Sequence, residues 1–486
     1  MTRTVDKPKW SLRRHTKDFD KLCIVAQTIK NYTNGSITNS DKESMQNKLR
    51  SLGLYSERNP DMPLDAIEHK IRDLAFYMFG YRDIQTKKFL FSPLGNLFLS
   101  NLEDKEKITK IFFTMLWSMQ YEHPESSTET SFRLYPFRLI FELLNEHKLD
   151  KKLFSHEIAY VVMFTNKMDS DDAYKNVVKK ILNLRRMSTE ELANLFIADE
   201  HALVNAVYEW DYYSSKVLSS AGIITKKEGE KICTLSHPTK NQKTKATTRK
   251  VCRSLIEFPP EYLSLYNDLS SAFPLYSTPL DKNDPERLQI DAIKEIYSFY
   301  PRVLLEHLGD DSQKARDIEE LLKLPRNIDR YSNNNDGREA YLFEDVLKDG
   351  FNMFYNVDAN KIGGAGNTDI ECLYTDKKTK FAVDAKSTKN KLSSINSGRM
   401  KNHREKIGGK YTIVVTPRYV RAVEHDIRDT KIVILRASTF SEYLYNCIQS
   451  DIRDIDYSKF DEIIENNLGT DISQHVSNLT IEQFAS

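Results

Sequence analysis

Two aspartates and a lysine in the C-terminal third of the chain have the side chains and the spacing of a hydrolytic metal site. Asp384 and Lys386 are two residues apart in the run 381–386, which predicts a strand, so both side chains share one face. Asp369 begins the preceding predicted strand and can reach the same place. Carboxylate oxygens are ligands that Mg²⁺ prefers, and a neighbouring cation can orient the attacking water and offset developing charge. The three residues therefore predict a centre for phosphodiester hydrolysis.

The spacing alone is weak support. The chain is 29% charged, so roughly half a dozen acid-x-Lys triplets are expected by chance, and the alternative is an ordinary polar surface hairpin. The surroundings favour a site, because a glycine-rich segment (363–369) leads into the first strand and a basic segment (399–406) follows the second. Glu344 borders the buried face of the preceding helix, where an acid needs a partner such as a metal or an arginine.

The elements that must hold these residues predict a small domain with a mixed α/β sheet. Residues 331–337 are rich in asparagine and end in glycine, a composition that interrupts helices and strands. We therefore place the domain boundary there and expect the domain to span 331–486. Its predicted elements are a helix over 338–354, strands over 370–374 and 381–386 with a turn at 376–379, a basic helical segment over 399–406, and strands over 411–416 and 431–435.

The residues before this domain predict mainly helical structure. A helix from His201 carries Leu203, Val207 and Trp210 on one face, and strands over 223–225 and 231–235 follow it with a turn at 226–229. A helix followed by a basic-tipped hairpin is typical of a winged helix, in which Lys226 and Lys227 would meet DNA phosphates. The alternative is a small hairpin that touches no DNA. The expected order is an N-terminal DNA-recognition domain (1–150), a second, winged-helix-like domain (151–254) and a helical connector (255–330).

Composition sets limits on the class of protein. The 486 residues suggest several domains, and 71 Lys+Arg against 70 Asp+Glu give a net charge of +1, which does not by itself indicate a nucleic-acid partner. Within 240–253, however, six basic residues stand without an acid, among them Lys243, Lys245 and Arg249. Such a run can follow a phosphate backbone, although a solvated loop is an equally good interpretation.

Cysteine spacing and hydropathy exclude other classes. The five scattered cysteines form neither a C-x-x-C pair nor a ligand set with histidine, which argues against a zinc site or a disulfide framework. The apolar runs are too short to cross a bilayer, and the first residues carry no apolar leader segment. We therefore expect a cytoplasmic protein with no membrane partner.

At Thr368-Asp369 and Asp384-Ala-Lys386 the chain resembles the PD-(D/E)XK nuclease superfamily, with threonine in place of the usual proline. The order of features is similar to type IIS restriction endonucleases, and most similar to the AlwI-type family and its strand-nicking relatives. The resemblance implies a multidomain α+β protein with winged-helix-like recognition domains and a C-terminal α/β nuclease domain. The segments that carry it are Trp10-Ser11, 89–100, 117–121, 201–237, 342–351, 366–369 and Asn402-His403.

Carried over to this chain, the resemblance implies an acidic site of Glu344, Asp369 and Asp384, with Lys386 as the catalytic cation. The backbone carbonyl of Ala385 would join the carboxylates as a ligand of Mg²⁺, for which Mn²⁺ would substitute. His403 is a candidate auxiliary residue, although a histidine on a basic helix is an equally good interpretation. By the same resemblance, cleavage would occur to one side of a short asymmetric site and leave 5′-phosphate and 3′-hydroxyl ends.

The partners implied are double-stranded DNA, a cognate DNA methyltransferase, and either a transient homodimer of cleavage domains or a second nuclease subunit, because one chain holds one catalytic set. The basic residues proposed to contact DNA are Arg13, Arg14, Arg133, Arg138, Lys216, Lys226, Lys227, Lys243, Lys245, Arg249, Arg399 and Lys401.

Two alternatives compete with a restriction endonuclease. One is a repair, recombination or transposon-end nuclease of the same superfamily. The other is a DNA-binding regulator whose nuclease domain is inert, although the complete set of Asp369, Asp384 and Lys386 argues against it. A complex DNA cut into discrete fragments would disfavour the first, and Mg²⁺-dependent cleavage would exclude the second.

Overall fold

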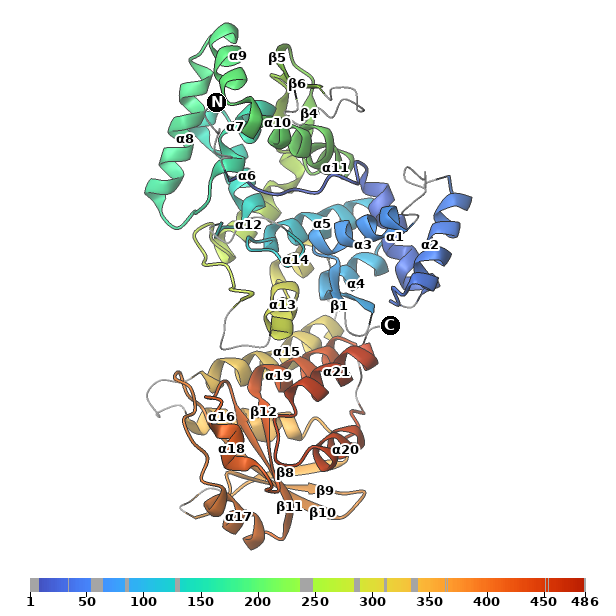
Figure 1. Ribbon diagram of the computed structural model, residues 1–486, viewed down its shortest axis with the longest axis vertical. Coiled ribbons are helices and arrows are strands. Elements are labelled where there is room, and N and C mark those ends of the chain that lie inside the picture. The colour runs from blue at the N-terminus through green and yellow to red at the C-terminus, as the bar shows by residue number, and fades with distance from the viewer. Residues whose placement is uncertain are drawn as a thin grey trace, which may run out of the picture. The chain divides into compact units, whose positions relative to one another are not determined.

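The computed structural model describes residues 8–33, 35–53, 64–83, 87–126, 132–236, 248–283, 289–309, 313–333, 340–362, 364, 366–450, 452 and 454–484, with backbone alone at 289–291 and 313–319 (Figure 1). The chain forms two compact units. The first comprises Met1–Asn283 with Ala292–Gly309, and the second comprises Asp284–Asp291 with Asp310–Ser486.

The first unit is mainly helical, with short strands inserted between the helices (Figure 1). Typical capping residues stand at the N-termini of its helices, such as the capping box of Ser188 and Glu191 at α9. The helices are α1 Phe19–Tyr32, α2 Asn39–Ser51, α3 Asp65–Phe76, α4 Pro93–Ser100, α5 Lys105–Ser118, α6 Pro136–Asn145, α7 Ser155–Tyr160, α8 Asp171–Arg185, α9 Thr189–Ala198, α10 Glu200–Glu209, α11 Ser215–Ser220, α12 Leu263–Ala272, α13 Gln289–Tyr297 (this unit from Ala292) and α14 Arg302–His307.

Among the residues that the structure describes, three small sheets complete this unit. The strands are β1 Gly80–Asp83, β2 Lys88–Phe91, β3 Lys152–Phe154, β4 Thr225–Lys227, β5 Lys231–Ser236, β6 Thr248–Cys252 and β7 Leu255–Glu257. They pair as β1-β2, as β3-β7-β4 and as β5-β6. One continuous hydrophobic core runs through the unit and includes the buried Trp10, Trp117 and Trp210.

The predicted hairpin after residue 222 is wrong, although both of its strands exist. β4 pairs with β7, and β5 pairs with β6, so the two strands lie in different sheets. Between them the backbone of Gly229 passes so close to Arg253 that a Cβ would lie 1.9 Å from the carbonyl oxygen. This close approach requires glycine, and the chain leaves β4 for a new sheet instead of turning back. Lys226 and Lys227 therefore lie on a strand and not at the tip of a wing.

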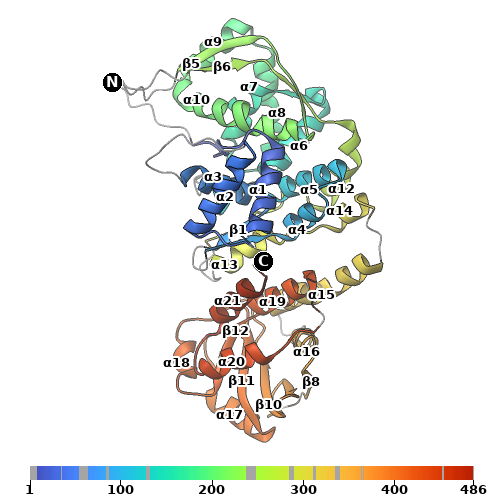
Figure 2. The ribbon, with the colours of Figure 1, turned by 90° about the vertical axis from the view of Figure 1, so that its right-hand side faces the viewer.

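The second unit is a mixed five-stranded sheet with helices packed against it (Figure 2). The strand order is β12-β11-β10-β9-β8, in which β8, β9 and β10 are antiparallel neighbours and β10, β11 and β12 are parallel. Its elements are α15 Gln313–Ser332, α16 Ala340–Phe351, β8 Val357–Lys361, β9 Ile370–Tyr374, β10 Thr379–Ala385, α17 Ser397–Lys406, β11 Gly409–Thr416, α18 Val423–Ile427, β12 Ile432–Arg436, α19 Ala437–Gln449, α20 Ser458–Asn466 and α21 Ser473–Phe484.

The predicted mixed α/β sheet is confirmed, with one strand more than expected. β8 was missed because its sequence, VDANK, has only two apolar residues, and its place at the sheet edge leaves Asp358, Asn360 and Lys361 exposed. The alternation along β10 gives the sheet two distinct faces. Phe381 and Val383 join the larger core with α16 and α19, whereas Asp384 lies on the opposite face. A smaller core on that side includes Met400 of α17.

The chain divides differently from the four predicted domains. The expected connector, 255–330, is split between the two units. β7 is the central strand of the sheet β3-β7-β4 in the first unit. α15 belongs to the second unit because its apolar side is buried there, with Leu322 and Ile328 at most 2% exposed. The boundary therefore precedes α15 and does not coincide with the breaker at 331–337. Within the described residues, no helix is long and apolar enough to cross a membrane.

Candidate active site

The pairing of β9 with β10 brings the two predicted aspartates together. The antiparallel register aligns Val383 with Ile370, the first residue of β9, so Asp369 just before β9 lies near Asp384. Thr368, 1% exposed, donates a hydrogen bond from its hydroxyl to the Val383 carbonyl at 3.0 Å. This bond ties Thr368, the residue before Asp369, to β10.

The predicted lysine completes the cluster. The Lys386 Nζ contacts Asp384 Oδ1 and lies 3.8 Å from Asp369 Oδ2. The Ala385 backbone N–H donates to Asp369 Oδ2 at 2.8 Å, and the Lys386 N–H continues the sheet by donating to the Val415 carbonyl at 2.9 Å. Strand alternation and sheet hydrogen bonds thus hold all three functional groups within one small volume. The sequence prediction that these residues meet is confirmed by the geometry.

The charges in this cluster do not balance. Asp384 is 3% exposed, and two carboxylates share the single ammonium group of Lys386. Burial raises the pKa of Asp369 to about 6, the nearby charge of Asp384 adds to that shift, and Lys386 opposes it. Like charges held close together in a desolvated place favour protonation of one of them or the binding of a cation.

The chemistry of the donors fits a hard divalent cation. Asp369 and Asp384 offer carboxylate oxygens, and the Ala385 carbonyl lies 3.5 Å from the same Lys386 ammonium. Mg²⁺ commonly takes one or two protein carboxylates and completes its shell with water and phosphate oxygens. Within the described part of the chain, no group of three or more His, Cys, Asp or Glu side chains is arranged to hold a metal. The protein's contribution would therefore be two carboxylates and one carbonyl.

Glu344 lies on α16, and its buried-edge position has the partner that the sequence demanded, although that partner is a lysine. The Lys361 Nζ of β8 lies 3.0 Å from Glu344 Oε2 and 3.1 Å from Asp345 Oδ1. The charge of Glu344 raises the pKa of Asp369 slightly. Glu344 thus shapes the field around the cluster while its own carboxylate is held by Lys361, which the sequence analysis missed because β8 was not expected.

His403 lies on α17, which packs beside β10 and β11. It is 7% exposed, and its Nδ1 has no hydrogen-bond partner among the described residues. Burial lowers the pKa of His403, whereas the negative charge of Asp384 opposes that shift. A neutral imidazole beside the cluster is consistent with the predicted auxiliary role. The neighbouring Lys406 donates to the Gly366 carbonyl at 2.5 Å and secures the loop that leads to Asp369.

The basic residues predicted to contact DNA have different surroundings. Arg138 is 3% exposed and donates to the Trp117, Phe273 and Pro274 carbonyls, so the prediction that it contacts DNA is wrong. Arg138 is buried because it belongs to α6, an apolar helix that packs into the core. Lys216, Arg249, Arg399 and Lys401 lie wholly or partly at the surface, and Lys243 and Lys245 lie outside the described residues.

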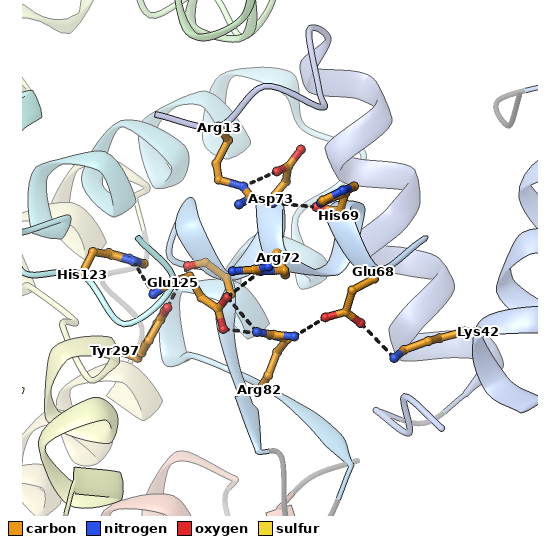
Figure 3. A network of polar contacts seen from close by, with 11 residues as sticks. Arg13, Lys42, Glu68, His69, Arg72, Asp73, Arg82, His123, Glu125 and Tyr297 are labelled. Atoms are coloured by element: carbon orange, nitrogen blue, oxygen red, sulfur yellow. Dashed lines mark hydrogen bonds and ion pairs between the residues drawn. The ribbon is translucent and has the colours of Figure 1, made fainter. Parts of the chain in front are cut away.

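Five more of these residues are bound to carboxylates. Figure 3 shows Arg13 beside Asp73, with 2.6 Å between Arg13 Nε and Asp73 Oδ1. Arg14 pairs with Glu209, Arg133 with Asp281 at 2.8 Å, Lys226 with Asp211, and Lys227 with Glu257 at 3.2 Å. Lys226 is only 14% exposed, which removes it from the surface that a wing would present. Each of these basic residues thus has a partner within the first unit, and contact of the exposed ones with DNA stays a prediction.

Comparisons with known proteins agree with a nuclease. Residues 5–273 match the family model for the N-terminal domain of the type II restriction endonuclease HgaI. The chain is 42% identical over 484 residues to the type II restriction enzyme HgaI of Avibacterium volantium, covering 99% of this chain and 98% of that protein.

Two solved structures of the restriction endonuclease FokI, one of them bound to DNA, were also found. They cover 95% and 97% of this chain, and 99% and 100% of their own, at 9% and 11% identity with TM-scores of 0.28 and 0.25. Scores this low support no argument about the fold. The likeness to the AlwI-type family stays a prediction, because the sequence matches are to HgaI. On those matches, this chain belongs to the HgaI family of type II restriction endonucleases.

Proposed function

We propose that the chain is a type IIS-like endonuclease that cuts double-stranded DNA to one side of a short asymmetric site. The first unit would recognise the site, and the second would hydrolyse the phosphodiester bond with Mg²⁺, leaving 5′-phosphate and 3′-hydroxyl ends. The observation that carries the proposal is the cluster of Asp369, Asp384 and Lys386 on paired strands. Its lysine contact and its PD-(D/E)XK-like motif support a complete catalytic set.

The division of the chain supports action at a distance from the recognition site. The cluster lies wholly in the second unit, whereas the HgaI N-terminal family model covers only residues of the first unit. A cutting unit with its own hydrophobic core can act beside a sequence that another unit reads. One cluster in each chain further implies a transient homodimer or a second nuclease subunit for double-strand cleavage. A cognate DNA methyltransferase would protect the host site.

The roles of the residues follow from their contacts. Asp369, Asp384 and the Ala385 carbonyl would hold the cation, which supplies Lewis-acid polarisation of the phosphate and a more acidic water. The Lys386 ammonium, already beside both carboxylates, would orient the attacking water and stabilise the charge that develops on the phosphate oxygens. The Ala385 N–H fixes the Asp369 carboxylate, so this part of the site is arranged before DNA binds.

A plasmid and phage-DNA digest tests this function. Wild-type protein and Asp384→Asn would be compared in Mg²⁺, in Mn²⁺ and in EDTA, with Asp349→Asn as the matched control. Asp349 is an exposed acid on α16 of the same unit. We expect discrete Mg²⁺-dependent fragments from wild type and control. The rate should fall about 10³-fold in Asp384→Asn, since several kcal/mol of transition-state stabilisation correspond to that factor.

Mapping the fragment ends by sequencing would reveal the site and the offset of the cuts. Cuts at a constant distance outside a common sequence support the type IIS assignment. Cuts inside that sequence would contradict the offset, and equal cleavage by Asp384→Asn would contradict the assigned centre. A plasmid that stops at the open-circle form at every enzyme concentration would exclude the homodimer version.

A further inference from the structure

A row of tyrosines lines one side of the helix α10–α11 in the first unit. Between α10 and α11 the helix widens into a π-helical turn, Trp210–Ser214. Tyr208, Tyr212 and Tyr213 lie at and before this turn, their rings touch, and the hydroxyl groups of Tyr208 and Tyr213 are 3.0 Å apart. Turns of this type are frequent at functional sites. Tyr208 and Tyr212 are only partly buried.

Cations from distant parts of the chain lie on these rings. The guanidinium carbon of Arg249 is 3.8 Å from the centroid of Tyr208 and 5.2 Å from that of Tyr212. The Lys17 Nζ is 4.8 Å from the centroid of Tyr213. Arg249 comes from β6, which lies with β5 beside α10 (Figure 1). Its neighbour Lys250 is anchored too, since its backbone N–H donates to the Tyr212 hydroxyl at 3.2 Å.

Lys216 extends the row by one helical turn. It is exposed and follows Tyr212 by four residues, so it lies on the same side of the helix. We name the set of Lys17, Lys216, Arg249 and Lys250, with the three tyrosines beneath them, the tyrosine–cation strip. All its members belong to the first unit and lie within the range of the HgaI N-terminal family model.

The cations of the strip lack the carboxylate partners that five other basic residues of this unit have. Among the described residues, none of the four makes an ion pair with a carboxylate, whereas Arg13, Arg14, Arg133, Lys226 and Lys227 all do. Asp211, the acid within the π-helical turn, is neutralised by Lys226. The four cations of the strip therefore carry charge that no ion pair among the described residues offsets. Aromatic faces hold the Arg249 guanidinium in place by cation–π attraction without satisfying its charge.

We propose that the tyrosine–cation strip is a phosphate-binding surface for the backbone of the DNA substrate. The proposal rests on the proposed function in that DNA is its ligand. Positively charged side chains that are already ordered lose little conformational freedom when they meet phosphates, and such contacts fix the register of a protein on the duplex. The strip would thus position the first unit on DNA, while bases are read by other groups.

Salt-dependent binding tests the proposal. A fluorescent 60-base-pair duplex with a site mapped from the digest would be titrated in EDTA at 50–200 mM salt. The variants are the double mutants Arg249→Ala/Lys250→Ala and Lys17→Ala/Lys216→Ala. The matched control is Lys179→Ala/Lys180→Ala, which removes two exposed lysines from α8 of the same unit. Each lost phosphate contact should lower the slope of log K against log salt by about 0.9. Two lost contacts should therefore reduce the salt-induced loss of affinity over this range roughly tenfold.

We expect both strip variants to bind more weakly with a shallower slope, and the control to match wild type. The Lys17/Lys216 variant guards against misfolding, because both side chains are exposed. Unchanged slopes in both strip variants, or an equal change in the control, would overturn the proposal. If the wild type bound DNA but never cut it, the proposed function would be wrong. The salt dependence of DNA binding would still test the role of the strip.

Discussion

The two units use buried carboxylates in opposite ways. In the first unit Glu209 is fully buried, and it accepts from Lys9 Nζ at 2.6 Å, Arg14 Nε at 2.9 Å and the Leu12 N–H at 3.0 Å. In the second unit two carboxylates share one lysine. Because its charge is fully compensated, Glu209 holds together segments that lie far apart in the sequence. The deficit of positive charge in the second leaves it able to attract a cation.

The polar network in Figure 3 illustrates the first case. Arg82 lies between Glu68 and Glu125, with 2.8 Å from its Nε to Glu125 Oε1, and Lys42 approaches Glu68 from α2 at 2.8 Å. Burial raises the pKa of Asp73, and the guanidinium of Arg13 opposes that shift. Here each acid meets at least one cation, so the network joins helices. Burial of a carboxylate is therefore common to both sites, and the local balance of charge is what distinguishes them.

The largest expected effect breaks the compensated site. Glu209→Gln leaves the Lys9 ammonium, 15% exposed, and the Arg14 guanidinium without their carboxylate. Because an uncompensated buried charge is costly, the free energy of unfolding should fall by roughly 3–5 kcal/mol. Urea unfolding measures it. The control is Glu106→Gln, which removes a 71% exposed acid paired with Lys110 at 2.6 Å and should cost at most about 1 kcal/mol. Equal losses of unfolding free energy in the two variants would show that Glu209 does not stabilise the fold by joining these segments.

The second prediction concerns pH and the uncompensated site. The folded protein raises the pKa of Asp369 from 3.8 to about 6, so it favours the protonated form. Its contribution to stability is full below pH 3.8 and is lost as pH rises through about 6. Asp369→Asn, which imitates the neutral form, should therefore be more stable than wild type at pH 8, by roughly 1–3 kcal/mol. The advantage should shrink toward pH 4. Urea unfolding across this range checks it, and an advantage independent of pH would contradict the cause assigned here.

The same titration predicts the pH dependence of cleavage. A carboxylate must be ionised to hold a metal, so Mg²⁺-dependent cleavage should rise with pH through about 6 if Asp369 is a ligand. Raising the Mg²⁺ concentration should shift the midpoint of this rise to lower pH, because bound cation favours the ionised form. A midpoint that does not change with the Mg²⁺ concentration would show that a group other than a metal ligand titrates.

The smallest effect is stabilisation by the metal itself. Mg²⁺ at ten times its dissociation constant should stabilise the wild type by about 1.4 kcal/mol, which follows from mass action on the folded state. For a unit of this size the unfolding temperature should rise by roughly 2–5 °C, and EDTA should reverse it. Asp384→Asn should show no rise, whereas Glu209→Gln should keep the full increment from its lower starting value. A rise in both variants would mean that Mg²⁺ binds outside the cluster.

Local patterns in the sequence predicted the cluster of Asp369, Asp384 and Lys386. A strand has a period of two residues, so the apolar run around Asp384 already placed Lys386 on the same face. The breaking turn at 376–379 then implied the antiparallel partner that carries Asp369, and the structure confirms both. The same local reasoning predicted α10, β4, β5, β11 and β12 to within a few residues. These features depend on neighbours in the chain, which is why the sequence alone specifies them.

Which ion pairs the charged side chains make depends, in contrast, on contacts between segments far apart in the chain. Lys9 and Glu209 are 200 residues apart, and the cations of Lys17 and Arg249 meet tyrosines of one helix although they come from opposite ends of the first unit. The pairing of β4 with β7, the place of α15 and the burial of Arg138 likewise depend on distant segments. An ion pair is decided by which side chains the folded core brings within a few ångströms. Spacing along the chain does not contain that information, because the same type of basic side chain is held in an ion pair beside a carboxylate and stays available to a phosphate without one.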